Sequence, residues 1–214
     1  METPLDDSLG LERLAFFSDA VIAIAMTLLV LELRLPQSGG SHVDVLLQLR
    51  HLAPKLVSFV VSFGVIGLYW EAHHRVFRHV RRYDRTFLWI NLLFLFCLAF
   101  LPFPTALLGD YFPLRSVMFL YAATVTAIGV VRMLLWRYAT HKFRLVDVTL
   151  ADWVIRGETW AGATVPMIFL ISLGVAFIDS RAAVLCWLLA VPASSFARRR
   201  ASKREIPALT RSKE

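Results

Sequence analysis

The feature that most constrains this chain is an early apolar block, RLAFFSDAVIAIAMTLLVLEL at residues 13–33. A helix needs about 20 apolar residues to cross the roughly 30 Å hydrocarbon core of a bilayer. Because lipid offers the backbone no hydrogen bonds, such a segment crosses the bilayer as an α-helix. Asp19 lies near the start of the block, where an ionised side chain is costly and marks a functional position.

Similar blocks recur along the chain, and they predict an all-α membrane protein. Of its 214 residues, 57% are hydrophobic and 18% are charged, and the mean hydropathy is +0.62. Soluble domains carry about 25% charged residues. The blocks predict six membrane-spanning helices per chain, at residues 14–34, 54–77, 87–108, 116–138, 160–178 and 181–197.

Local signals refine these spans. The segment SHVDVLLQLRHLAPKL has helical periodicity, so the second span could begin before residue 54. Pro102 and Pro104 each remove a backbone donor from the third span, which predicts a kink or break near residue 101. Only a few residues around IDSR separate the last two spans, so we expect them to form an antiparallel hairpin.

Lysines and arginines gather on one side of the predicted membrane. With the N-terminus inside, the cytoplasmic segments hold 18 of the 23 basic residues and the outer segments hold 5. This bias predicts that both termini lie in the cytoplasm. We expect one six-helix domain at residues 1–197 and a basic, disordered tail at 198–214 that contacts anionic lipid. The acidic leader METPLDDSLGLER does not resemble a signal peptide, so the first span is expected to be retained.

Motifs of enzymes and of carbonyl-lined ion filters are absent from the sequence. It contains no HExxH, GxSxG or Walker A motif and no TVGYG-type filter, so we expect neither an enzyme nor a cofactor. His73 and His74 point about 100° apart on a helix and are not expected to share a metal ion. The arginines of HHRVFRHVRRYDR follow a span, which indicates a solvated helix extension rather than a voltage sensor. The hydropathy excludes a soluble nucleic-acid-binding protein.

Two interpretations of Asp19 remain open from the residues. Ser18 and Asp19 can cap the N-terminus of a helix. At about 100° per residue, however, Asp19 faces away from one stripe of the same helix, so it can instead pack against other helices. The stripe consists of Ile24, Thr27, Leu28 and Leu31. Partners expected for Asp19 on the same side of the membrane are Trp70, His73 or His74, and Asn91.

The residues Arg13, Phe17, Ser18, Asp19, Ala23 and Ile24 are spaced as in the RxxxFSDxxxAI signature. In this respect the chain resembles the transmembrane protein 175 family, the potassium channels of lysosomes and prokaryotes. The stretches TLLVLEL, YWEAHH and FLPFPTALLGDY also resemble that family. The motifs cover about the first half of the chain, and the number of spans extends the resemblance to the rest.

The resemblance implies a fold with six spans per unit. A single FSD segment is similar to the prokaryotic form, which implies a homotetramer in a bacterial plasma membrane with the first helix lining a central pore. Ile24, Thr27, Leu28 and Leu31 would then line that pore. A polar network of Arg13, Phe17, Ser18, Asp19, Trp70, His73, His74 and Asn91 would fix the pore helix.

The same resemblance implies how ions are selected. Rings of Ile24, Leu28 and Leu31 would form an apolar constriction, with a ring of Thr27 hydroxyls between them. A dry constriction of this kind excludes water and favours ions that shed hydration readily. Potassium is expected to pass, as are rubidium and caesium, and no resident metal is expected.

A secondary transporter of a monovalent cation or small solute is the main alternative function. Such proteins usually show internal repeats, broken helices in matching positions and charges near the bilayer midplane. This chain has proline interruption mainly in its third span and no second copy of the FSD segment. These features favour a channel over a transporter.

Overall fold

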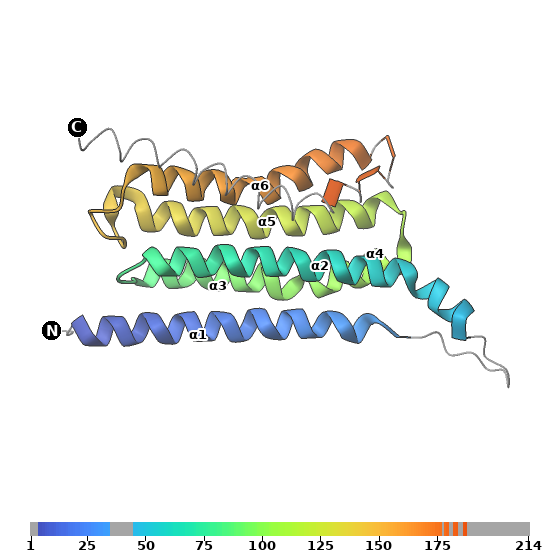
Figure 1. Ribbon diagram of the computed structural model, residues 1–214, viewed down its shortest axis with the longest axis horizontal. Coiled ribbons are helices and arrows are strands. Elements are labelled where there is room, and N and C mark those ends of the chain that lie inside the picture. The colour runs from blue at the N-terminus through green and yellow to red at the C-terminus, as the bar shows by residue number, and fades with distance from the viewer. Residues whose placement is uncertain (1–3, 35–44, 177, 180–181, 184–185, 188–214) are drawn as a thin grey trace, which may run out of the picture.

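The fold is a bundle of α-helices that lie along one long axis (Figure 1). The computed structural model describes residues 4–34, 45–176, 178–179, 182–183 and 186–187. The side chains of 4–8, 45–49 and 51 are not described. The elements are α1 (Pro4–Leu28), the 3₁₀ turn η1 (Leu29–Glu32), α2 (Val45–His79), α3 (Arg85–Phe100), α4 (Pro102–Tyr111), α5 (Arg115–Thr140), the 3₁₀ turn η2 (His141–Phe143) and α6 (Asp152–Ala176).

Five segments among the described residues are long and apolar enough to cross a membrane. They correspond to the first five predicted spans, so the all-α membrane class is confirmed for this part of the chain. Several helices are longer than predicted. The first begins at Pro4, the second begins at Val45 and the fifth spanning helix begins at Asp152 rather than residue 160. The predicted sixth span, 181–197, and the tail, 198–214, lie outside the described residues except at 182–183 and 186–187.

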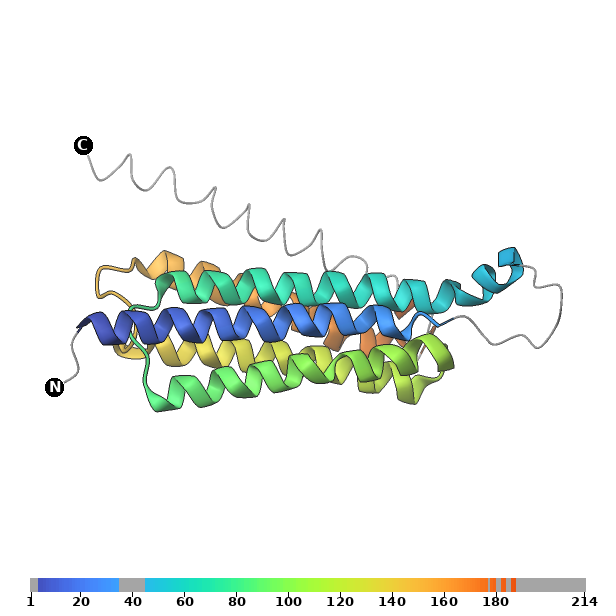
Figure 2. The same cartoon turned by 90° about the horizontal axis from the view of Figure 1, so that it is seen from below.

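The helices are arranged in three layers. In Figure 1, α1 lies along one side, α2 and α3 form the middle, and α5 and α6 lie on the far side. Viewed from below, α1 lies in front of α2 and α3 and contacts both (Figure 2). The start of α1, the α2–α3 link and the α5–α6 link meet at the same end of the bundle. Only 22% of the spanning part of α1 is buried, against 50% for α5.

The predicted break in the third span is present at Leu101. Here α3 ends and α4 begins, and the N–H of Leu101 bonds to the Leu98 carbonyl at 3.1 Å in a 3₁₀-like turn. Pro102 and Pro104 cannot donate to the preceding turn, which explains the break. Buried hydroxyls join the helices around it. Ser62 on α2 bonds to Thr105 at 2.8 Å and to the hydroxyl of Tyr121 at 2.9 Å.

A buried aromatic cluster joins α5, α6 and the segment beyond α6. The rings of Phe169 and Trp187 are stacked with centroids 5.4 Å apart, and Tyr121 lies 4.9 Å from Trp187. The indole N–H of Trp187 donates to the Ser172 hydroxyl at 2.6 Å. Trp187, which falls within the predicted sixth span, thus packs onto the α5–α6 pair.

The α2–α3 link and the α5–α6 link contact each other at the end of the bundle where α1 begins. Val80 and Val146 form an isolated antiparallel bridge, and the N–H of Arg81 donates to the Leu145 carbonyl at 2.8 Å. Asp84 accepts hydrogen bonds from the Phe87 N–H at 2.8 Å and from the Tyr138 hydroxyl at 2.6 Å. It therefore caps α3 and ties that helix to α5.

The charge of Asp84 gives this end of the bundle a defined pH dependence. Partial burial raises the pKa of Asp84, but hydrogen bonds from Tyr138 and Phe87 and the nearby Arg144 outweigh that effect, so the pKa lies below its ordinary value. A depressed pKa means that the ionised form stabilises the folded state. That stability is fully present above the ordinary pKa of about 3.9 and is lost as pH falls through the depressed value.

We expect Asp84→Ala to lower the free energy of unfolding by about 1 kcal/mol, because the cap of α3 is lost. Asp84→Asn keeps an N-cap oxygen and should lose less. The measurement is thermal unfolding of the purified protein in detergent from neutral pH downwards. The difference between wild type and Asp84→Ala should shrink below pH 3.9 or so; a difference that grows on acidification would contradict this assignment.

Candidate functional site

One face of α1 is exposed and mostly apolar from Phe16 to Leu31. Ile24 is 58% exposed, Leu28 is 41% exposed and Leu31 is 54% exposed. The opposite face carries Ile22, Ala25 and Leu29, which are at most 1% exposed. The four residues of the predicted stripe, Ile24, Thr27, Leu28 and Leu31, therefore all point away from the helices of their own chain.

The sequence-based geometry assumes that Leu31 lies on a regular α-helix, but in the structure it does not. The α-helix ends at Leu28, and residues 29–32 continue as a 3₁₀ turn. In a 3₁₀ turn, residues three apart lie directly above one another. Leu31 is thereby aligned with Leu28 rather than rotated away from it, and both remain on the exposed face.

Thr27 lies between Ile24 and Leu28 on the exposed face. Its hydroxyl donates to the Ile24 carbonyl at 2.8 Å. Because the hydroxyl proton is occupied, the oxygen lone pairs remain available to a cation. The side chain can therefore act as an acceptor on a face that is otherwise apolar.

Asp19 lies deep within α1, so the interpretation as an N-terminal cap is wrong. The helix begins at Pro4, so the backbone N–H groups near Asp19 already bond to carbonyls of the preceding turn. Instead, Asp19 accepts a hydrogen bond from the indole N–H of Trp70 on α2 at 2.9 Å. The ring of His74 lies 6.1 Å from that of Trp70 and is exposed to the outside of the bundle.

A continuous chain of buried polar groups joins three helices next to Asp19. The amide N–H of Asn91 on α3 donates to the Ser18 hydroxyl on α1 at 2.9 Å. The Asn91 oxygen lies 2.8 Å from Nε2 of His73 on α2. Ser18, His73 and Asn91 are all at most 1% exposed. Of the adjacent histidines, His73 is thus the one that joins the buried group, while His74 lies beside Trp70.

Two residues predicted for the network lie elsewhere. Arg13 and Phe17 are on the exposed face of α1, about in line with Ile24. Phe17 is 51% exposed. Neither is hydrogen-bonded to the Ser18–Asn91–His73 group in the described part of the structure. Both lie on the same face of α1 as the predicted stripe, and the Ser18–Asn91–His73 group lies on the other side of the helix.

The sequence analysis missed a second polar group, between α2, α5 and α6. Arg75 donates from Nε to the Glu158 carboxylate at 2.9 Å and 3.2 Å. Arg132 lies beside them and is completely buried. The sequence pattern indicates only cytoplasmic charge for both arginines, and a solvated helix extension for Arg75. The signal that distinguishes Arg132 is its position within the apolar run GVVRMLLW.

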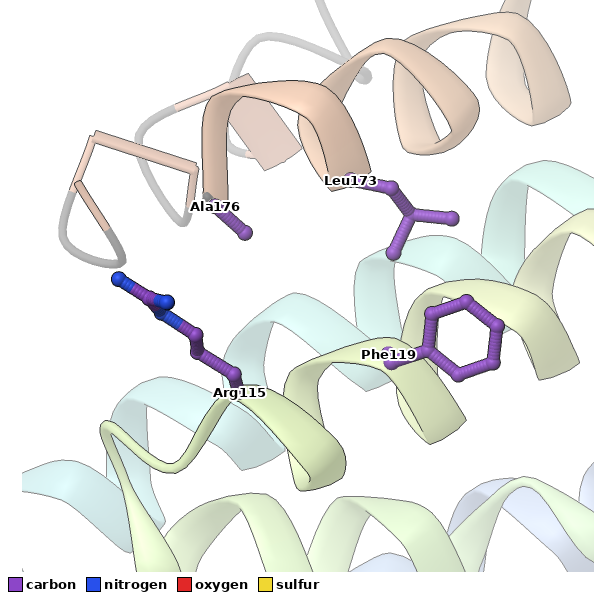
Figure 3. A pocket seen from close by; sticks show the side chains of 4 residues that line it. All are labelled: Arg115, Phe119, Leu173 and Ala176. Carbon is purple, nitrogen blue, oxygen red and sulfur yellow. The ribbon is translucent and has the colours of Figure 1, made fainter. Parts of the chain in front are cut away.

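Cavities elsewhere in the bundle are mostly apolar. A cavity of about 30 Å³ lies between the start of α5 and the end of α6. Figure 3 shows Phe119 and Leu173 across from each other, with Arg115 and Ala176 completing the lining. A larger apolar cavity of about 330 Å³ lies beside α2 and Trp187. Among the residues that the structure describes, no three His, Cys, Asp or Glu side chains are placed to hold a metal ion.

Comparison with known proteins places these features in a family. A sequence profile described as "Endosomal/lysosomal potassium channel TMEM175" matches residues 13–102. A protein of Chamaesiphon minutus named a potassium channel is 35% identical over 196 residues, which cover 89% of this chain and 96% of that protein. The chain belongs to the TMEM175 family. It is therefore a member of a family of ion channels rather than of enzymes.

Two further comparisons extend the family likeness of this TMEM175 family member to a solved structure and to a human protein. The crystal structure of a lysosomal potassium-selective channel TMEM175 homolog from Chamaesiphon minutus is similar with a TM-score of 0.77 at 33% identity, covering 88% of this chain and 98% of that one. The endosomal/lysosomal proton channel TMEM175 of Homo sapiens is 31% identical over 131 residues, which cover 61% of this chain and 26% of that protein.

The buried amide of Asn91 offers a direct test of the polar group. Asn91→Leu preserves the size of the side chain but leaves Ser18 and His73 without their partner, so we expect a loss of about 1–2 kcal/mol in the free energy of unfolding. Trp70→Phe removes only the partly exposed hydrogen bond to Asp19 and should cost less. Thermal unfolding in detergent measures both; an Asn91→Leu protein as stable as wild type would contradict a supporting role for this amide.

Proposed function

We propose that the chain forms a potassium-permeable channel in which four copies surround a central pore lined by the exposed face of α1. The observation that carries the proposal is that face itself. Ile24, Leu28 and Leu31 are each more than 40% exposed while the other side of the same helix is buried. Relatives named potassium channels support the ion.

The selectivity mechanism follows from the chemistry of the stripe. Four copies of Ile24 would form one apolar ring, and four copies of the aligned Leu28 and Leu31 would form a second. A narrow apolar ring excludes water, so an ion must shed part of its hydration shell to pass. Potassium, rubidium and caesium lose water more readily than sodium and are favoured. The Thr27 oxygen, with its proton held by Ile24, offers a partial replacement for lost water.

The polar group behind α1 holds this face toward the axis. Ser18 and Asp19 are adjacent in sequence and contact two different helices, since Asp19 bonds to Trp70 of α2 and Ser18 to Asn91 of α3. Two anchors on neighbouring residues fix the rotation of α1 about its own axis. The rotation of α1 matters because turning the helix by about 100° would bring a different side chain to the position of Ile24.

The proposed orientation places both termini in the cytoplasm of a bacterial plasma membrane. The α2–α3 link, with Arg81, Arg82 and Arg85, lies at the same end of the bundle as the α5–α6 link, with Lys142 and Arg144. Cytoplasmic loops of membrane proteins carry such an excess of basic residues. On this assignment α1 enters the membrane from the cytoplasm.

Reconstitution in planar bilayers decides between a channel and a transporter. Under bi-ionic potassium and sodium conditions, a channel gives unitary currents whose reversal potential reports selectivity. A transporter gives saturating flux without such steps. A pH gradient in the same chamber tests proton permeation, because the human relative is named a proton channel.

The Ile24 ring is tested by Ile24→Asn. An amide wets the ring, so we expect conductance to rise several-fold and the preference for potassium over sodium to fall. The control is Leu170→Asn, which places the same amide on an exposed position of α6, in the layer farthest from α1. It should leave both quantities unchanged. Currents identical in wild type and Ile24→Asn would show that this ring is not the constriction.

A further inference from the structure

The helix that carries the exposed stripe ends in a tight turn with an arginine. After η1, Leu33 has φ −81° and ψ 61°, which are the angles of an inverse γ-turn. The N–H of Arg34 donates to the Glu32 carbonyl at 2.9 Å and closes this turn. The turn changes the direction of the chain, so the side chain of Arg34 reaches back along the end of the helix.

The guanidinium of Arg34 is held at the end of the stripe. Its Nε donates to the Leu31 carbonyl at 3.1 Å, and Leu31 carries the last side chain of the stripe. A cation at this place satisfies a terminal carbonyl and complements the negative end of the helix dipole. The same hydrogen bond fixes a positive charge beside the residue that the proposed function places around the pore.

The charge of Arg34 is permanent and has no direct counterion. A guanidinium stays protonated in proteins. In the part of the chain that the structure describes, no carboxylate forms an ion pair with Arg34. Its one hydrogen bond to a side-chain nitrogen comes from a neutral backbone carbonyl as the acceptor, so the positive charge remains at the exposed end of α1.

Glu32, the carboxylate nearest to Arg34 in the sequence, lies on a different side of the turn. In a 3₁₀ turn, residues three apart lie above one another, so Glu32 is in line with the fully buried Leu29. Glu32 lines a small cavity with Lys55 of α2 and Asp110 of α4, which pair with each other at 2.6 Å. The two charges of the turn are thus separated: the carboxylate lies toward helices of its own chain, and the guanidinium lies at the stripe.

We propose that Arg34 determines which cations enter the pore from its outer mouth. This inference rests on the proposed function, in which four copies of the stripe surround the axis and α1 enters from the cytoplasm. Four copies of Arg34 then form a ring of positive charge outside the ring of Leu31. The ring repels approaching cations, and it repels a divalent cation with twice the energy that potassium experiences. It therefore reduces inward potassium current and keeps external magnesium and calcium away from the apolar constriction.

Ionic strength sets how far this repulsion reaches. The Debye length is about 30 Å at 0.01 M salt and about 3 Å at 1 M salt. The repulsion therefore acts at low salt and is screened at high salt. A purely structural effect of Arg34 on the shape of the turn has no such dependence, so the salt dependence of the current separates the two roles.

The test compares Arg34→Gln, which removes the charge but keeps an N–H donor for the Leu31 carbonyl, with Arg34→Lys, which keeps the charge. The measurement is the ratio of inward to outward potassium current at equal and opposite voltages, in excised membrane patches whose orientation is known. In symmetric potassium chloride at about 0.01 M, we expect Arg34→Gln to raise this ratio about two- to fivefold. Arg34→Lys should stay close to wild type, and all three proteins should give the same ratio at about 1 M.

Arg115→Gln is the matched control. Arg115 begins α5 at the same end of the bundle, in the layer beyond α2 and α3 from α1 (Figure 1). The variant loses the same charge without altering the stripe, so its current ratio should equal that of wild type in both salts. A ratio raised as much by Arg115→Gln as by Arg34→Gln would overturn the proposal, because the effect would then belong to the surface charge as a whole.

External magnesium provides a second readout. At low salt, the magnesium concentration that halves the inward current should be lower in Arg34→Gln than in wild type, by about the square of the factor found for potassium, because the repulsion scales with the charge of the ion. Equal sensitivity to magnesium in the two proteins would overturn the proposal.

Wild type alone provides a measurement that needs no variant. Its ratio of inward to outward current should rise between about 0.01 M and about 1 M potassium chloride as the ring is screened. A ratio that does not change with salt, or an Arg34→Gln effect that persists at high salt, would overturn this inference and leave the pore assignment intact. Absence of potassium current from wild type would overturn the proposed function and this inference with it, so the two failures are distinguishable.

Discussion

The amide of Asn91 is the contact on which the placement of α1 depends. Helices in lipid gain little from hydrophobic association, so packing and hydrogen bonds decide where they dock. The spanning part of α1 has the smallest buried share of the five candidate spans, at 22%. Asn91 bonds to Ser18 on α1 and to His73 on α2 while it is itself on α3. One side chain therefore joins the helix with the least packing to both helices beneath it.

On the proposed function, this arrangement places the supporting contacts and the ion-facing side chains on opposite sides of a single helix. The side of α1 that carries Ser18 is polar and buried at that level, and the side that carries Ile24 is apolar and exposed. The change from α-helix to 3₁₀ turn after Leu28 brings Leu31 over Leu28. A short segment at the C-terminal end of α1 thus presents two leucines in line, where a regular α-helix would offset them.

Much of the fold and part of the site could be predicted from the sequence. Five apolar blocks gave five spanning segments, and two prolines predicted the break at Leu101, because these effects are local. Trp70, His73 and Asn91 could be named as partners of the FSD segment because few other polar residues occur in the apolar blocks nearby. The choice between His73 and His74 depends on how α2 is rotated, which tertiary packing determines.

Other features had no local signal or a misleading one. The predicted first span starts at residue 14, yet α1 begins at Pro4, because hydropathy locates the apolar part of a helix and not its charged continuation. Asp19 resembled a cap only while the helix was taken to begin at residue 14. Counting basic residues on each side of the membrane assigns Arg132 to the cytoplasmic side, because such a count does not show that its side chain is buried.

The fit of Arg132 against Gly162 has an evolutionary consequence. The guanidinium occupies the volume that any side chain at position 162 would need. A chain that acquires a larger residue there must first shorten the residue at 132, and a chain that loses Arg132 is free to replace the glycine. The two positions are expected to covary across homologous sequences, although they lie on different helices and neither contacts the proposed pore.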